Sequence, residues 1–282
     1  MNATSISDII VQTLLANDMD TYFVVTGGSI VPLLDAVASC SKARYFCFQH
    51  EQAAAMAAEG YFRAIGKTAV VCVTSGPGVQ NIFNGVCGCW YDSVPAFFIT
   101  GQVSTKESLE NYQSKPRQAG FQEMPVVEIF SHVCKACEQV REVDSVTQTL
   151  ERLLIQLRTP RFGPVLLDLP VNIQMSSTCH SGHFKSVCLA TSPSLKAEVA
   201  SDVYASICDS KRPLLVFGHG VKLANACTEA IDFAEKNGIP FVLSWGAFDI
   251  CSTFHPLRVG AIGVYGDRSA TLPSKMQISS SL

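Results

Sequence analysis

Short apolar runs bounded by glycine or proline alternate along the chain with longer segments that have helical periodicity. The clearest run, TAVVCVTS at 68–75, is apolar almost throughout, which is typical of a strand buried on both faces of a parallel sheet. The preceding segment, 51–66, is rich in alanine and ends at Gly66, which predicts a helix with a glycine C-cap. This alternation predicts βαβ units and an α/β fold, an open parallel sheet flanked by helices.

The same pattern predicts the other elements of the first part of the chain. Ser5 or Ser7 is the predicted N-cap of the first helix. Residues 102–125 are polar and irregular, and they are too long for an ordinary connection, so they form a candidate functional loop. Strands are predicted at 21–28, 43–49, 95–101 and 164–170, and helices at 5–17, 29–38, 144–158 and from Gly76-Pro77-Gly78 to about Trp90.

Three regions of different character predict the domain organisation. Residues 1–171 hold the elements above and form the first domain. Residues 172–197 are rich in Ser, Thr and His with little periodicity, which indicates an inter-domain linker. Residues 198–282 begin a second, Rossmann-like α/β domain, with helices near 196–208 and 223–237 and strands at 212–220 and 240–244. Because only two strands are clear before a polar, aperiodic ending, we expect this second domain to be partial.

Composition narrows the function classes. Of the 282 residues, 48% are hydrophobic and 16% charged, and the net charge is −3, so nothing favours binding to nucleic acid or an anionic membrane. No apolar run approaches the ~18 residues of a membrane span, and the N-terminus lacks the basic start of a signal peptide. We therefore expect a cytoplasmic protein. The 12 cysteines lack zinc-site spacing and are predicted to be free structural thiols, with a cysteine-held metal as the weaker alternative.

Glu51 is the first candidate for chemistry, because it follows an apolar strand and begins the alanine-rich helix. A glutamate there can act only as a partner of the helix dipole, yet the carboxyl end of a strand is also where ligands bind in open α/β sheets. The glycines of TSGPGVQN (74–81) allow a ligand to approach the backbone, although the string matches no nucleotide-binding motif. Ser75 lies in S-G-P-G, which does not match a hydrolase motif, and His50 and His219 are interpreted as core or strand-end residues.

The order and spacing of several segments resemble the thiamin-diphosphate-dependent enzymes of the acetolactate synthase-like superfamily. The resemblance extends to about Ala270. It implies that the first domain binds the aminopyrimidine ring of the cofactor, and that Glu51 is a catalytic residue that shares a proton with a ring nitrogen. The segments are FVVTGG (23–28), HEQAAAMAAEGYFRAIGK (50–67), VVCVTSGPGVQN (70–81), DSVPAFFITGQV (92–103), GFQE (120–123) and RFGPVLLDLP (161–170).

The resemblance also assigns further residues one position at a time. Those matching the cofactor-binding positions of the family are Gly27, Gly28, Thr74, Pro77 and Asn81. Phe121 and Gln122 match a pair on the substrate side, Lys135 a lysine slightly beyond it, and Arg161 an arginine that contacts flavin in members that carry FAD. Thr26 and RQAG (117–120) depart from the usual pattern, which leaves the substrate open.

The implied activity is decarboxylation of a 2-oxo acid, with carboligation as in branched-chain amino acid biosynthesis, in a homodimer or homotetramer. In the family, Mg²⁺ and the diphosphate are held by a Gly-Asp-Gly…Asn segment of a third domain, and Gly266-Asp267-Arg268 is the nearest string here. We therefore expect a truncated chain that is inactive alone, and FAD stays open. Two alternatives remain: a non-catalytic chain that associates with full-length relatives, and a small-molecule-binding α/β module.

Overall fold

The computed structural model describes residues 4–114, 116–178 and 197–270. The chain divides into two compact units, residues 1–192 and 193–282, and each has its own parallel sheet. No helix in the described residues is long and apolar enough to cross a membrane.

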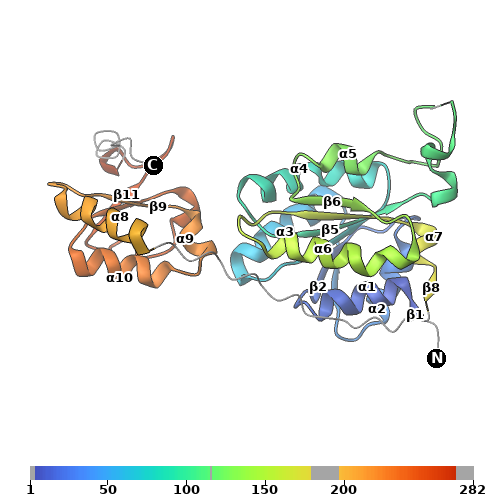
Figure 1. Ribbon diagram of the computed structural model, residues 1–282, viewed down its shortest axis with the longest axis horizontal. Coiled ribbons are helices and arrows are strands. Elements are labelled where there is room, and N and C mark those ends of the chain that lie inside the picture. The colour runs from blue at the N-terminus through green and yellow to red at the C-terminus, as the bar shows by residue number, and fades with distance from the viewer. Residues whose placement is uncertain (1–3, 115, 179–196, 271–282) are drawn as a thin grey trace. The chain divides into compact units, whose positions relative to one another are not determined.

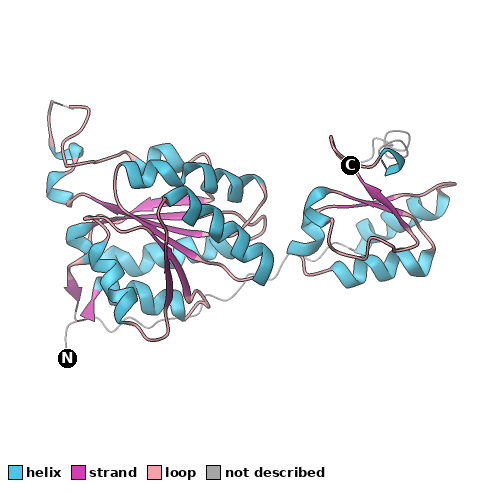
Figure 2. Cartoon of the chain, turned by 180° about the vertical axis from the view of Figure 1, so that it is seen from behind, coloured by secondary structure: helices cyan, strands magenta, loops and turns pink. Residues whose placement is uncertain are grey.

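The first unit is built on a six-stranded sheet in which every neighbouring pair runs parallel (Figures 1 and 2). The strand order is β3-β2-β4-β5-β7-β6. The strands are β2 (Thr21–Val24), β3 (Arg44–Cys47), β4 (Val70–Val73), β5 (Phe97–Gln102), β6 (Ala136–Gln139) and β7 (Val165–Pro170). This architecture confirms the predicted α/β fold with an open parallel sheet.

Helices cover both faces of this sheet (Figure 1). One core contains α1 (Ile6–Leu15), α2 (Val31–Ser39) and α6 (Val146–Arg158), together with sheet residues such as Leu167. The opposite core contains α3 (Glu51–Ile65), α4 (Pro77–Tyr91) and α5 (Val126–Phe130), together with Leu166. Successive side chains of a strand point to opposite faces, so central strands must be apolar throughout when both faces are covered.

The connections reverse direction between β2 and β4. From β2 the chain passes through α2 to β3 on one side, then returns through α3 to β4 on the other. In open α/β sheets such a reversal leaves a crevice at the carboxyl ends of the two strands, where ligands bind. The loops at this edge follow β2, β3 and β4, and they contain most of the residues that the sequence selects as candidates.

Local chemistry fixes several element ends where the sequence predicts them. The Ser5 hydroxyl accepts a hydrogen bond from the Asp8 amide at 3.0 Å, so Ser5 and not Ser7 caps α1. Gly66 ends α3 in the left-handed conformation at φ 75°, as predicted. Gly76 also has a positive φ of 60°, and it lets β4 turn into α4, which begins at Pro77.

Several elements of the first unit were not predicted. β6 and α5 were missed, and so were α7 (Val171–Gln174) and the pair of short strands β1 (Thr4–Ser5) and β8 (Ser177–Thr178). Residues 171–178 therefore pack on the first unit, although the sequence prediction gave 172–178 to the linker. The rest of that linker, 179–196, lies outside the described residues.

The second unit is a smaller three-stranded parallel sheet of order β11-β10-β9 with helices beside it (Figure 1). Its elements are α8 (Ala197–Asp209), β9 (Leu215–Phe217), α9 (His219–Leu223), α10 (Cys227–Asn237), β10 (Phe241–Leu243) and β11 (Arg258–Ala261). β11 adds a third strand to the two predicted. The helix predicted near 223–237 is α10, whereas α9 was not predicted and overlaps the end of the strand predicted at 212–220; Asn225, with a positive φ of 54°, separates the two helices.

Helices α3 and α4 pack closely because small residues line their contact. Ala54, Ala55 and Ala58 are fully buried on α3. A Cβ at Gly85 of α4 would lie 2.4 Å from the Ala55 Cβ, closer than two carbon atoms can approach. The spacing of the two helices therefore requires glycine at position 85.

Replacing this glycine should destabilise the first unit. We expect Gly85→Ala to lower the free energy of unfolding by about 1–3 kcal/mol, because the added methyl meets a rigid backbone. The matched control is Gly60→Ala in α3, where a Cβ meets nothing within 4 Å; it should stabilise by about 0.5–1 kcal/mol through helix propensity. Denaturation followed by Trp90 fluorescence in a Trp245→Phe background reports on the first unit. Equal effects of the two substitutions would contradict the close contact.

Candidate functional site

The Glu51 carboxylate lies at the crevice edge of the sheet, at the first turn of α3. His50 caps this helix, with its Nδ1 accepting a hydrogen bond from the Gln52 amide at 3.2 Å. Asn81, one turn into α4, donates from Nδ2 to Glu51 Oε2 at 2.8 Å. No hydrogen bond to Glu51 Oε1 is found among the described residues. One carboxylate oxygen is thus fixed, while the other can receive a ligand.

Glycines allow close approach of the backbone beside this carboxylate. A Cβ at Gly78 would lie 2.9 Å from Thr74 Cγ2 and 3.5 Å from Glu51 Oε1, so the start of α4 lies directly against both groups and a side chain at 78 would clash with Thr74. A Cβ at Gly27 would overlap the Thr74 side chain at 2.4 Å, whereas Gly28 meets nothing within 4 Å. The loop after β2 therefore touches Thr74 at Gly27 and exposes open backbone at Gly28.

Ser29 joins the loop after β2 to the loop after β4. Its hydroxyl lies 2.9 Å from Thr74 Oγ1 and accepts a hydrogen bond from the Ser75 amide at 2.9 Å. The sequence prediction did not select Ser29. Its only signal was its place directly after the glycine pair, which many turns share.

The segment 103–124, between β5 and α5, is held by its own polar contacts. The Glu123 carboxylate accepts hydrogen bonds from the amides of Leu109 at 2.7 Å and Gly120 at 3.1 Å, and from the Ser108 hydroxyl at 3.1 Å. Gln122 contacts the glycine turn of the site, because a Cβ at Gly76 would lie 2.7 Å from the Gln122 Cβ. Phe121 is 83% exposed. The segment predicted as a functional loop is thus a wall beside the crevice.

Lys135 and Arg161 lie at the amino ends of the strands, whereas Glu51 lies at the carboxyl ends. Lys135 directly precedes β6, and Arg161 lies shortly before β7, so both are at the amino ends of parallel strands. The Lys135 ammonium donates to the carbonyl of Thr159, and burial lowers its pKa. Arg161 Nε donates to the Ser93 hydroxyl at 2.7 Å. Within this unit, neither residue is brought together with Glu51, and their roles toward substrate and flavin stay predictions.

Asp168 is a buried acid that the sequence prediction did not single out. It lies in β7 with no exposed surface, beside Thr100 of β5 and Gln139 of β6 in the strand register. Its carboxylate accepts hydrogen bonds from Thr100 Oγ1 at 2.7 Å, Gln139 Nε2 at 2.8 Å and Gln102 Nε2 at 3.1 Å. Burial raises the pKa of this carboxyl from 3.8 to about 6, although the three hydrogen bonds oppose the rise.

The described cysteines are free thiols. Cys72 is a fully buried core residue of β4, as predicted, and burial raises its pKa. Burial also raises the pKa of Cys89 and of Cys137 to about 12, so these thiols stay protonated and unreactive near neutral pH. The described part of the chain contains no group of three or more His, Cys, Asp or Glu side chains that could hold a metal ion.

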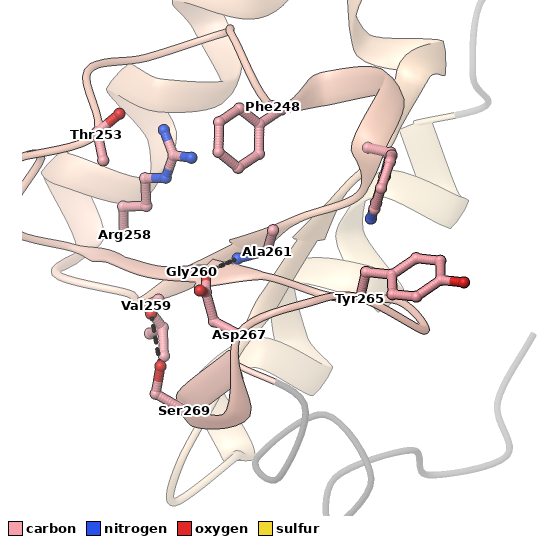
Figure 3. A pocket seen from close by; sticks show the side chains of 10 residues that line it. Phe248, Thr253, Arg258, Val259, Gly260, Ala261, Tyr265, Asp267 and Ser269 are labelled. Carbon is pink, nitrogen blue, oxygen red and sulfur yellow. Dashed lines mark hydrogen bonds between the residues drawn. The ribbon is translucent and has the colours of Figure 1, made fainter.

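The second unit has a pocket of about 780 Å³ lined by β11 and by residues that follow β10 and β11 (Figure 3). Figure 3 shows the Arg258 guanidinium beside the Phe248 ring, with 4.4 Å between its carbon and the ring centroid. The Asp267 carboxylate accepts a hydrogen bond from the Ala261 amide at 2.8 Å and so closes the loop after β11. The pocket's charged groups thus have partners within the unit.

Two domain models of one enzyme family match the chain, one in each unit. The thiamine pyrophosphate enzyme N-terminal TPP binding domain matches residues 4–129. The thiamine pyrophosphate enzyme central domain matches residues 200–273. The first match contains Glu51, Asn81 and the glycine turns described above.

Curated relatives agree with these matches. An acetolactate synthase large subunit of Lactococcus lactis is 30% identical over 95% of this chain and 46% of its own length. An acetolactate synthase isozyme 2 large subunit of Escherichia coli is 31% identical over 93% of this chain and 46% of its own length. A chloroplastic acetolactate synthase 2 of Brassica napus is 31% identical over 83% of this chain and 36% of its own length. The chain thus spans less than half the length of these relatives.

The raised pKa of Asp168 predicts a specific pH dependence of stability. Between about pH 4 and pH 6 the folded state holds a proton that the unfolded state has released, so the free energy of unfolding falls as pH rises. In Asp168→Asn this contribution is absent, because asparagine does not titrate. As pH rises from about 4 to about 6, the free energy of unfolding of the variant should therefore increase by roughly 3 kcal/mol relative to that of the unaltered protein. Above this range the difference between the two proteins should stay constant. Denaturant unfolding between pH 4 and pH 8, followed by Trp90 fluorescence in a Trp245→Phe background, measures the difference; a difference independent of pH would contradict the shift.

Proposed function

Since the chain belongs to the thiamine pyrophosphate enzyme family, we propose that it is the cofactor-activating half of an acetolactate synthase-like enzyme. The observation that carries the proposal is the Glu51 carboxylate, with Oε2 held by Asn81 and with no hydrogen bond to Oε1 among the described residues. A carboxylate fixed on one side and open on the other can hold a proton between itself and a ring nitrogen of a bound heterocycle.

The backbone around Glu51 suits an aminopyrimidine ring. Glycine at 78 lets the start of α4 lie against Thr74 and the Glu51 carboxylate with no side chain in the way, and Gly28 leaves backbone accessible to an amino group. Pro77 begins α4 and fixes this turn. When bound, thiamin diphosphate supplies the nucleophilic carbon and the electron sink that cleavage of a 2-oxo acid requires.

The role of the chain's own residues is to bind, orient and exchange a proton. Glu51 Oε1 would hold the shared proton at the ring nitrogen, and Asn81 would keep the carboxylate in that orientation. Gln122, against Gly76, would form a wall on the side where substrate enters, and the exposed Phe121 ring would extend it. In this proposal Mg²⁺ and the diphosphate are held by a further region of the complete enzyme, in a homodimer or homotetramer.

Binding of the isolated pyrimidine tests the proposal without the diphosphate. We expect the chain to bind 4-amino-5-hydroxymethyl-2-methylpyrimidine in isothermal titration. Glu51→Leu should weaken the affinity by about tenfold or more, because the ring nitrogen loses a hydrogen bond to a charged group. The matched control is Glu59→Leu on the same helix, whose carboxylate pairs with Arg63; it should leave the affinity unchanged.

Two results would contradict the proposal. One is unaltered binding by Glu51→Leu, which would remove this carboxylate from the site. The other is the lack of any binding by the unaltered chain at millimolar pyrimidine.

A further inference from the structure

The amide of Gln102 connects a buried charge to a surface segment. Gln102 ends β5 and is 3% exposed. Its Nε2 donates both to Asp168 Oδ2 at 3.1 Å and to the Met124 carbonyl at 3.0 Å, and its Oε1 accepts from the Val103 amide at 2.9 Å. One side chain thus bonds both ends of the 103–124 segment and anchors them to β7.

Other contacts hold the first part of this segment: the Thr105 amide donates to Asn172 Oδ1 at 2.9 Å, Asn172 Nδ2 donates to the Thr105 hydroxyl at 3.0 Å, and Glu110 pairs with Arg141. A cavity of about 250 Å³ lies beneath the segment, lined by Gln102, Gln139, Glu123 and Met124 among others. Glu123 fixes the segment internally, because its partners at 108–120 all belong to the segment itself. The polar contacts of Gln102 therefore attach the end of the segment that contains Gln122, where the Met124 side chain also packs in the core.

Contacts made by the segment extend from Gln102 to the crevice. Gly120 lies against the Val103 side chain, since a Cβ there would lie 2.8 Å from Val103 Cγ2. Gln122 in turn packs on Gly76, at the turn that leads into α4. A continuous series of contacts runs from the buried carboxylate to the wall beside Glu51 and Asn81.

We propose that Gln102 and Asp168 are positioning residues that hold the 103–124 segment, and with it Gln122, against the glycine turn of the site. The inference rests on the proposed function, because Gln122 has a role only if the crevice beside Gly76 receives a ligand. A carboxylate suits this task, since hydrogen bonds to a charged acceptor are shorter and stronger than those to a neutral one. Asp168 orients the Gln102 amide so that its second hydrogen bond reaches Met124.

Hydrogen exchange of the full chain, without ligand, tests this role. In Gln102→Met the side chain keeps its size but loses its three hydrogen bonds, and backbone amides of residues 103–124 should exchange about tenfold faster or more. Thr100→Val is the matched control, because Thr100 donates to the same carboxylate but does not touch the segment. It should leave exchange in 103–124 unchanged, and amides of β5 and β7 report whether the sheet is intact.

A second pair of variants separates positioning from general core damage. Asp168→Asn keeps an oxygen for the two glutamine amides and turns its NH₂ toward the Thr100 hydroxyl, so exchange in 103–124 should stay slow. Asp168→Leu removes the acceptor and should accelerate exchange in 103–124, as Gln102→Met does. If Gln102→Met does not fold, Gln102→Asn replaces it, since the shorter amide cannot span both Met124 and Asp168.

The possible results decide the inference independently of the pyrimidine titration. Unchanged exchange in Gln102→Met, or equal acceleration in Thr100→Val, would overturn it. Equal exchange in Asp168→Asn and Asp168→Leu would also overturn it, as would acceleration spread evenly over β5 and β7. If exchange behaves as expected while no pyrimidine binds, the proposed function fails but the attachment of the segment stands.

Discussion

Two loops and the end of β5 meet at the crevice edge of the sheet, so closely that only glycine fits at the contacts, and the site depends on this approach. A Cβ at Gly101 of β5 would lie 2.2 Å from the Ser29 carbonyl oxygen, and one at Gly27 would lie 2.4 Å from Thr74. Glycine at both positions lets the loop after β2 lie directly against β5 and β4. The hydroxyl of Ser29 can then bond the Ser75 amide, and the turn that leads into α4 is fixed.

The first unit contains two acids with opposite relations to water. Glu51 is partly accessible, as a carboxylate in the proposed binding role must be, whereas Asp168 is buried within the sheet. Asp168 can stay in the interior because three donors satisfy it, and its pKa is raised because burial still disfavours the charged form. One acid is thus open to a ligand and the other stays internal.

The sequence predicts the parts of the fold that apolar pattern controls. β4 and β7 are buried throughout and stand out as apolar runs, and Gly66 marks the end of α3. β6 was missed because ACEQ at the sheet edge is only half-buried and ends in polar residues. β11 was missed for a similar reason, since only Ala261 of its four residues is buried. Edge strands need fewer apolar side chains, so their pattern is weak.

Glu51 and the glycine segment 74–81 were candidates from the sequence alone, whereas the roles of the individual site residues came from the resemblance. The sequence cannot show that Asn81, 30 positions from Glu51, donates to it, because that distance depends on the packing of α3 against α4. Asp168 was missed because its three partners lie on β5 and β6, and an acid inside LLDLP has no local signature. Polar networks across strands depend on register, which hydrophobic periodicity does not specify.

The close contact of α3 and α4 has a consequence for how this family can vary. Both helices begin at the crevice, so their spacing sets the separation of Glu51 from Asn81. That spacing depends on the contact of Gly85 with Ala55, each about one turn along its helix from the site residue. A larger residue at 85 would be compatible with the same separation only beside a smaller residue at 55. Positions 55 and 85 are therefore expected to change together during divergence, although neither is a candidate site residue.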